Sequence, residues 1–116
     1  MDCIFCKIAK KEIPSSFVYE DENVFAIKDI HPQAKKHFLV IPKKHVRSLE
    51  EAFVEDSKGC VFVSDLFKAA NVVAKKEGLL PDGFRSVINT NDHGGQTVHH
   101  LHLHILGGEK LKGTFA

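Results

Sequence analysis

The sequence predicts an α+β fold, on the strength of two observations. Short apolar or alternating runs bounded by turn residues recur along the chain, whereas helical periodicity is sustained in one long segment. Strands and helices do not alternate regularly, which argues against a parallel α/β sheet. The length of 116 residues and the hydrophobic fraction of 43% fit one domain, residues 1–116, with an ordinary core.

The first half of the chain predicts a short helix followed by three strands. Cys3–Lys10 has apolar residues at helical spacing. Phe17–Glu20 and Val24–Asp29 flank a polar turn and are typical of a hairpin. His37–Pro42 is a continuous apolar run too short for a helix, so we expect a buried strand closed by proline.

The second half predicts the long helix and two further strands. Apolar residues recur at helical spacing across Glu55–Glu77, and Gly78 is placed to cap its C-terminus. Cys60 within this helix is expected to be a small buried apolar residue. Phe84–Asn91 and Leu101–Leu106 are expected to be strands, the latter alternating leucine with histidine. The predicted sheet is antiparallel, with one long helix and a short N-terminal helix.

Composition excludes several classes of function. The 16 Lys and Arg nearly balance 15 Asp and Glu, so no broad basic field is available for a nucleic-acid backbone. No apolar run approaches the roughly 18 residues of a spanning helix, and the N-terminus has no signal-peptide pattern. We therefore expect a cytoplasmic protein with neither a nucleic-acid nor a membrane partner.

The three cysteines include a C-x-x-C pair, Cys3 and Cys6. In a reducing compartment this spacing favours a metal site or a redox pair over a structural disulfide. An unmetallated thiol pair is the simplest alternative. The sequence alone leaves these readings open.

Four of the eight histidines lie between His99 and His104. On a strand, the period of two would place His100, His102 and His104 on one face and three aliphatic residues on the other. Such a row contributes little to stability, because imidazoles repel one another when charged and are costly to desolvate when neutral. A solvated edge strand is the alternative, and we favour a chemical role.

A glycine turn, Gly94-Gly95-Gln96-Thr97, leads into this segment. Adjacent glycines let backbone N–H groups approach an anion closely, and Gln96 and Thr97 add side-chain donors. A simple turn is the alternative reading. Beside the histidine row, however, the turn predicts a phosphate site facing a nucleophilic imidazole, whose unperturbed pKa of about 6.5 leaves it neutral near pH 7. No Walker motif is present, and no Mg²⁺ is expected to be required.

The pattern His100-Leu-His102-Leu-His104-Ile-Leu resembles the signature of the histidine-triad (HIT) superfamily. The segments that resemble its Hint branch, the purine nucleoside phosphoramidases, extend from Cys3 to Gly108 and include Asp29-Ile30, His37-Phe-Leu-Val-Ile-Pro-Lys-Lys-His45, Asn89, Gly94-Gly95-Gln96-Thr97-Val98 and Leu106-Gly107-Gly108. The resemblance implies a HIT-like fold and cleavage of a phosphoramidate through a covalent nucleotidyl-histidine.

The resemblance also implies roles for individual residues. His102 would be the nucleophile, His104 would contact phosphate oxygens, and Thr97 would contact the phosphate or the leaving group. Asp29 would accept the ribose hydroxyls. The remaining substrate contacts would come from His37, Asn89, the Gly95, Gln96 and Val98 region, and an apolar purine pocket of Phe5, Ile8, Ile27 and Ile30.

Two further implications concern a metal and a partner. Zinc-containing relatives use positions that match Cys3, Cys6, His45 and His100, which predicts a closed structural Zn²⁺ site. Hint-like proteins pair through the long helix and the following strand, which predicts a homodimer. The apolar residues on more than one face of the helix agree with this pairing.

Two departures bear on the substrate. Thr97 stands where many Hint sequences have serine, and the tail from Glu109 to Ala116 lacks the tryptophan and proline run of some relatives. Leaving-group preference is therefore open. The alternative functions are a Fhit-like dinucleoside polyphosphate hydrolase and a nucleotide- or zinc-binding interaction module.

Overall fold

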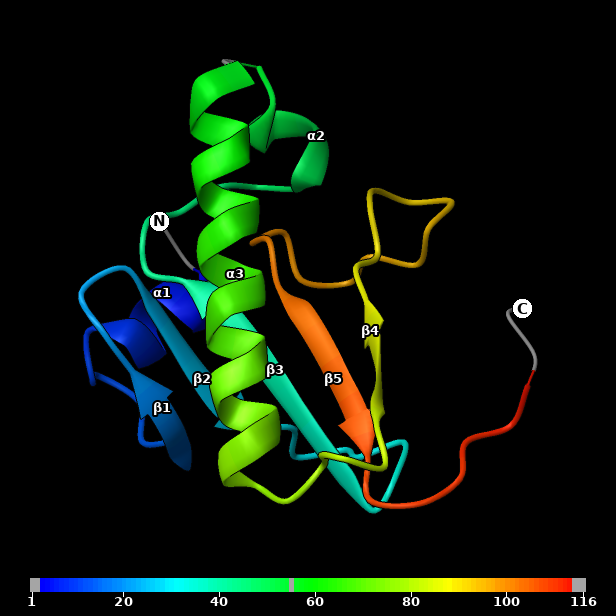
Figure 1. Cartoon of the computed structure of the whole chain (residues 1–116). Coiled ribbons are helices and arrows are strands. Elements are labelled where there is room, and N and C mark those ends of the chain that lie inside the picture. Colours follow the sequence, from blue (N-terminus) through cyan, green and yellow to red (C-terminus); the bar gives the residue numbers. More distant parts are fainter. Residues whose placement is uncertain (1–2, 55, 114–116) are drawn as a thin grey trace.

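The computed structural model describes residues 3–54 and 56–113 and confirms the α+β fold. A five-stranded antiparallel sheet, in the order β1-β2-β3-β5-β4, carries the long helix α3 across one face, and the short helix α1 packs on the other (Figure 1). The elements are α1 (Ile4–Ala9), β1 (Phe17–Glu20), β2 (Val24–Lys28), β3 (Lys36–Pro42), α2 (Leu49–Ala52), α3 (Asp56–Lys76), β4 (Phe84–Val87) and β5 (Leu103–Gly107).

The central strands bury both faces, which explains their continuous apolar runs. Ala26 on β2 pairs with Val40 on β3, and Phe38 on β3 pairs with Ile105 on β5. These side chains belong to the cluster beneath α3. Their neighbours of opposite parity, such as Leu39, belong to a second cluster beneath α1. Period-two alternation thus divides the apolar residues of β2 and β3 between two cores.

Helix α3 lies close to the sheet because its inward face is built largely of small residues. Leu66, Ala69, Ala70, Val73 and Ala74 are all buried, at 1% exposure or less. Its outward face leaves the apolar side chains of Val61, Phe67 and Val72 exposed to solvent. Gly78 follows the helix with φ of +77°, the left-handed conformation of a C-cap, as predicted.

Two expectations for this region need correction or restriction. Cys60 is exposed, so the prediction of a buried apolar cysteine is wrong, because the residue lies away from the inward face that Leu66 and Ala70 define. The predicted start of the helix at Glu55 lies outside the described residues.

Helix α2, a single turn that begins after Ser48, was not predicted from the sequence. The Ser48 hydroxyl accepts a hydrogen bond from the backbone N–H of Glu51 at 3.2 Å, which caps the N-terminus. Ser48-Leu-Glu-Glu51 has the S-x-x-E spacing of a capping box. Four residues are too few to show helical periodicity, and this cap was the available signal.

Strands β4 and β5 differ from the predicted ranges. Val87 on β4 pairs with His104, and the register would place Ile88 opposite Leu103, the first residue of β5. Residues 89–91 therefore extend beyond the start of β5 and have no β5 residue opposite them. Strand β5 begins at Leu103, which pairs with Val40, whereas His100 and His102 precede it. The sides of the chain still alternate as predicted, since Leu101, like Leu103 and Ile105, lies in the cluster beneath α3.

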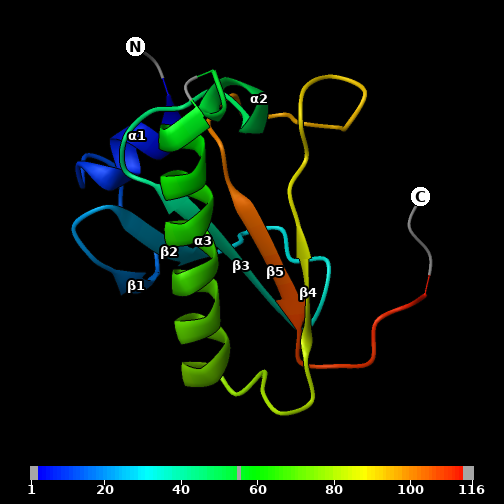
Figure 2. The same ribbon diagram turned by 45° about the horizontal axis from the view of Figure 1, so that its top comes forward.

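Figure 2 shows α1, α2 and the start of β5 near the same end of the sheet. The backbone N–H of Leu101 donates to the carbonyl of Val46 at 2.7 Å, which ties the approach to β5 to the segment after β3. The histidine-rich segment therefore enters the sheet at an end where α1, α2 and the segment after β3 also lie.

Among the described residues, no helix combines the length and apolar character needed to cross a membrane.

Candidate functional site

His102 has its tautomer set by the backbone. Its Nδ1 lies 2.7 Å from the carbonyl oxygen of His100, an acceptor, so Nδ1 carries the proton and the lone pair is on Nε2. Burial lowers the pKa of His102, against the opposing effects of that hydrogen bond and of Asp29. His102 is therefore neutral at pH 7 and holds an unprotonated Nε2, as a nucleophile requires.

Aromatic rings surround this imidazole. Phe5 of α1 meets the His102 ring edge-on, with 5.1 Å between centroids, and His104 meets it at 4.9 Å. Burial, together with the nearby His102 and His37, lowers the pKa of His104 to about 4. His102 and His104 are thus both neutral near pH 7, and the His102 ring has no charged neighbour among these ring contacts.

Asp29 and His37 adjoin His104 from the neighbouring strands. Asp29 follows β2, and its Oδ2 lies 3.3 Å from His37 Nε2. Its other oxygen, Oδ1, accepts the backbone N–H of His31 at 2.8 Å. The pKa of His37 is lowered by burial, although Asp29 acts in the opposite direction. A partly exposed carboxylate therefore lies beside the triad, where a ligand hydroxyl can reach it.

The four predicted metal ligands come together at the end of β3. The ligand atoms of Cys3, Cys6, His45 and His100 all lie within 4.8 Å of one another. Sulfur-to-nitrogen distances are 3.2 Å for Cys3 to His100, 3.4 Å for Cys6 to His45 and 3.6 Å for Cys6 to His100. A tetrahedral ion with ordinary Zn–S and Zn–N bonds separates such atoms by about 3.5 Å.

The outer contacts of this cluster also suit a metal ion. His100 Nε2 lies 2.8 Å from the carbonyl of Pro42, so the proton of neutral His100 is on Nε2 and Nδ1 faces the cysteines. Burial lowers the pKa of His100 to about 4, which keeps the imidazole in the neutral form that binds metals. The residues present therefore fit a closed two-cysteine, two-histidine site.

The glycine turn does not present the donors that the sequence suggested. The backbone N–H of Gly95 donates to Asp92, and that of Gln96 donates to Asn91, each at 3.0 Å. The Gln96 side-chain amide donates to the carbonyls of Arg47 and Val98, and its oxygen accepts the N–H of Asn91. In this structure these groups of Gly95 and Gln96 are therefore engaged within the protein, and their contact with phosphate stays a prediction. These hydrogen bonds hold the turn together.

The other residues predicted to contact the substrate differ in how deeply they are buried. Phe5, Ile8 and Ile27 are buried in the cluster beneath α1, whereas Ile30 lies in a loop and is 83% exposed. The structure thus brings together three of the four apolar positions that the resemblance implies. The polar or loop residues Asn89, Thr97 and Val98 are half-buried, exposed and half-buried respectively.

One site feature escaped the sequence analysis. A hollow of about 440 Å³ lies beside the cysteine cluster and Thr97, and Arg47 and His99 contribute to its lining. Thr97 therefore opens onto a surface that includes the side chains of Arg47 and His99. Arg47 is about fifty positions from Thr97 along the chain, and no local pattern links the two.

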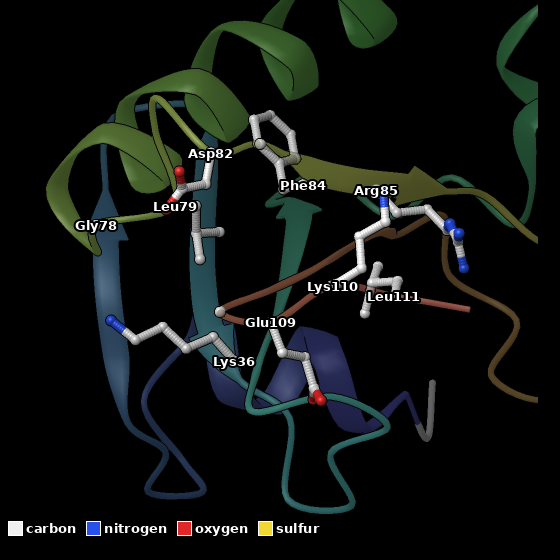
Figure 3. A pocket seen from close by; sticks show the side chains of 11 residues that line it. Lys36, Gly78, Leu79, Asp82, Phe84, Arg85, Glu109, Lys110 and Leu111 are labelled. Atoms are coloured by element: carbon white, nitrogen blue, oxygen red, sulfur yellow. The ribbon is translucent and has the colours of Figure 1, made fainter. Parts of the chain in front are cut away.

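A larger hollow of about 710 Å³ lies at the opposite end of the sheet, between Gly78, Phe84 and the chain after β5 (Figure 3). Two of its basic side chains already have local partners: Lys36 donates to the carbonyl of Glu77, and Arg85 donates to that of Lys112. None of the histidines His37, His100, His102 and His104 lines it. We therefore assign the chemistry to the histidine end.

Comparison with known proteins agrees with this geometry. The profile of the HIT domain matches residues 10–111. The purine nucleoside phosphoramidase of Escherichia coli is 41% identical over 110 residues, covering 95% of this chain and 90% of the relative. The 14 kDa zinc-binding protein of Zea mays is 48% identical over 113 positions, covering 93% and 83%.

A solved structure supports the same assignment. The HIT family hydrolase of Legionella pneumophila superposes with a TM-score of 0.88 at 44% identity, covering 97% of each chain. Both the sequence matches and the superposition include the triad segment, since they extend over nearly all of the chain. The chain belongs to the HIT, or histidine-triad, family of hydrolases.

Proposed function

We propose that the protein hydrolyses purine nucleoside 5'-phosphoramidates, with AMP- or GMP-linked amines as substrates, through a nucleotidyl-His102 intermediate. The observation that carries this proposal is the hydrogen bond that His102 Nδ1–H donates to the backbone carbonyl of His100, which leaves Nε2 unprotonated. The activity of the Escherichia coli relative, as its name states it, supports the substrate class.

The reaction has two displacements. His102 Nε2 attacks the α-phosphorus, the phosphorus–nitrogen bond breaks, and the amine leaves after it gains a proton. Water then attacks the same phosphorus, the bond to Nε2 breaks, and the nucleoside monophosphate leaves. His104 and Thr97 would stabilise the phosphoryl oxygens and the leaving group, and Asp29 would accept the ribose hydroxyls. Phe5, Ile8 and Ile27 would support the purine.

The decisive experiment replaces the nucleophile. His102→Ala should abolish turnover of adenosine 5'-phosphoramidate while the fold and much of the nucleotide affinity remain. Mass spectrometry of the quenched wild-type reaction should find the nucleotidyl adduct on His102. An adduct on another histidine, or wild-type activity in the variant, would refute the mechanism. Diadenosine triphosphate serves as the comparison substrate, and faster cleavage of it would favour the Fhit-like alternative.

We further propose that Cys3, Cys6, His45 and His100 hold a structural Zn²⁺ ion. Their interatomic distances and the name of the Zea mays relative support this assignment. A bound ion would supply cross-linking between the N-terminal segment and the sheet, and a closed shell leaves no position for substrate. Metal analysis should find about one zinc per chain. The double variant Cys3→Ser, Cys6→Ser should have a lower melting temperature, whereas its activity measured on ice should fall comparatively little. An unchanged melting temperature would refute the site.

The quaternary structure and location complete the proposal. A homodimer through α3 and β4 would cover the exposed Val61, Phe67 and Val72 on α3. Light scattering at micromolar concentration should report twice the chain mass, and a monomer would remove this assignment. We place the protein in the cytoplasm, where a reducing environment keeps the cysteine ligands as thiols. A nucleotide- or zinc-binding module without turnover is the alternative that the His102→Ala comparison also tests.

A further inference from the structure

Asp29, His37 and His104 form a second cluster of groups that could in principle bind a metal ion, outside the cysteine site. Their ligand atoms lie within 4.8 Å of one another. His37 Nε2 is 2.9 Å from His104 Nδ1 and 3.3 Å from Asp29 Oδ2. These separations resemble those between neighbouring ligands of one ion, so distance alone does not decide what the cluster does.

A backbone hydrogen bond to His37 shows whether this cluster can bind a metal ion. The N–H of Gln33 donates to His37 Nδ1 at 3.0 Å, so this nitrogen is an acceptor. A neutral imidazole has one donor and one acceptor nitrogen, which places the proton of His37 on Nε2. Nε2 then has no lone pair to offer a metal ion. The cluster is therefore a set of hydrogen bonds rather than a metal site.

The proton of His104 is located in the same way. His37 Nε2–H points to His104 Nδ1, which must accept, and the proton of neutral His104 is consequently on Nε2. His104 faces His102 at 4.9 Å between ring centroids. A chain of two hydrogen bonds, from the backbone of residue 33 through His37, thus determines which nitrogen of His104 donates beside the nucleophile.

We propose that His37 is a positioning residue which holds His104 as the Nε2–H tautomer, so that a neutral donor faces the phosphoryl oxygens during the reaction. The proposal rests on the proposed phosphoramidase function. It assigns to His37 an action through His104, in place of the direct phosphate contact that the family resemblance suggested. Asp29 Oδ2 lies 3.3 Å from His37 Nε2, and the negative carboxylate favours a proton on that nitrogen.

Two amide substitutions test the donor role of His37 Nε2 separately from the acceptor role of His37 Nδ1. The amide nitrogen of glutamine lies as many bonds from Cβ as Nε2 does, whereas the side-chain oxygen or nitrogen of asparagine reaches only the position of Nδ1. His37→Gln can therefore still donate to His104, and His37→Asn cannot. The matched control is His31→Asn, a substitution of an exposed histidine on the loop that precedes β3.

The expected results follow from the loss of one preorganised donor. His37→Asn should lower kcat for adenosine 5'-phosphoramidate by about tenfold to a hundredfold, with KM changed by less than about threefold. This loss is smaller than the roughly hundredfold to thousandfold loss on removing a donor outright, because His37 acts through His104. His37→Gln should recover most of the lost kcat, and His31→Asn should match the parent. Equal losses in the glutamine and asparagine variants would overturn the proposal.

A measurement without substrate keeps the proposal independent of the proposed function. Nitrogen-15 NMR of the histidine rings in the zinc-loaded protein should show His37 and His104 both protonated on Nε2 and unprotonated on Nδ1. A proton on His104 Nδ1, or a shift of the His37 Nε2 resonance on addition of excess Zn²⁺, would overturn the relay. If the spectra agree but no phosphoramidate is cleaved, the proposed function fails and the tautomer assignment stands.

Discussion

The half-buried, neutral His104 predicts that acid destabilises the folded protein. Its pKa is about 4 in the folded protein, against about 6.5 for an unfolded chain. Between these values the unfolded state binds more protons than the folded state, so stability is present above pH 6.5 and is lost as the pH falls. His37 and His102 face His104 and oppose its protonation, and Asp29 favours it.

The magnitude follows from the two pKa values. At about 1.4 kcal/mol per pH unit the full effect is about 3 kcal/mol, of which about 2 kcal/mol is lost at pH 5. Because His104 is only half-buried, solvent screening reduces this to about 1–2 kcal/mol. His104→Asn removes the titrating group, so the variant should lose less stability on acidification than the parent by that amount.

Urea unfolding of both proteins at about pH 7 and about pH 5 measures this difference directly. Acid release of a metal from the cysteine cluster acts on both proteins and cancels in the comparison. If the parent and His104→Asn lose equal stability, within about 0.5 kcal/mol, His104 is not held neutral by burial and the reasoning is wrong.

Three further changes test the site. Gly94→Ala should destabilise the protein by about 1–3 kcal/mol and reduce activity, because the new Cβ would lie 2.5 Å from the carbonyl oxygen of Thr90, whereas Gly113→Ala, with open space around it, should be neutral in thermal unfolding. Gln96→Leu should cost about 2–4 kcal/mol in urea unfolding, since it leaves two carbonyls and one N–H without their partner. Asp29→Asn should lower kcat/KM by about tenfold to a hundredfold for a ribonucleoside phosphoramidate and much less for the 2'-deoxy substrate; equal losses would refute the ribose role.

The sequence predicts the sheet well because its signal is local. The apolar run from His37 to Pro42 and the alternation around Leu103 reflect burial on each face, and both appear as strands. The end of β4 depends instead on where its partner begins. Val87 pairs with His104 close to the first residue of β5, and no property of residues 88–91 reveals that limit.

The site was predicted in its residue types and less well in its hydrogen bonds. The C-x-x-C spacing and the triad pattern identify cysteines and histidines that the structure brings together. The partners that set the tautomers are backbone groups, such as the carbonyl of Pro42 beside His100, and any residue type carries such a group. For the same reason the glycine turn suggested free N–H donors, although Gly95 and Gln96 use theirs internally.

His100 contributes to two sites through different parts of one residue. Its ring joins the cysteine cluster, and its carbonyl accepts the Nδ1 proton of His102. Thermodynamic linkage makes such a connection reciprocal. A metal ion bound in the cysteine cluster would restrain the backbone at His100 and thereby favour the His102 orientation in which Nδ1 donates to the His100 carbonyl. If this raises the affinity for nucleotide by some factor, bound nucleotide must raise the affinity for the metal ion by the same factor. Metal loss measured with and without bound nucleotide would then give the coupling free energy between the two sites.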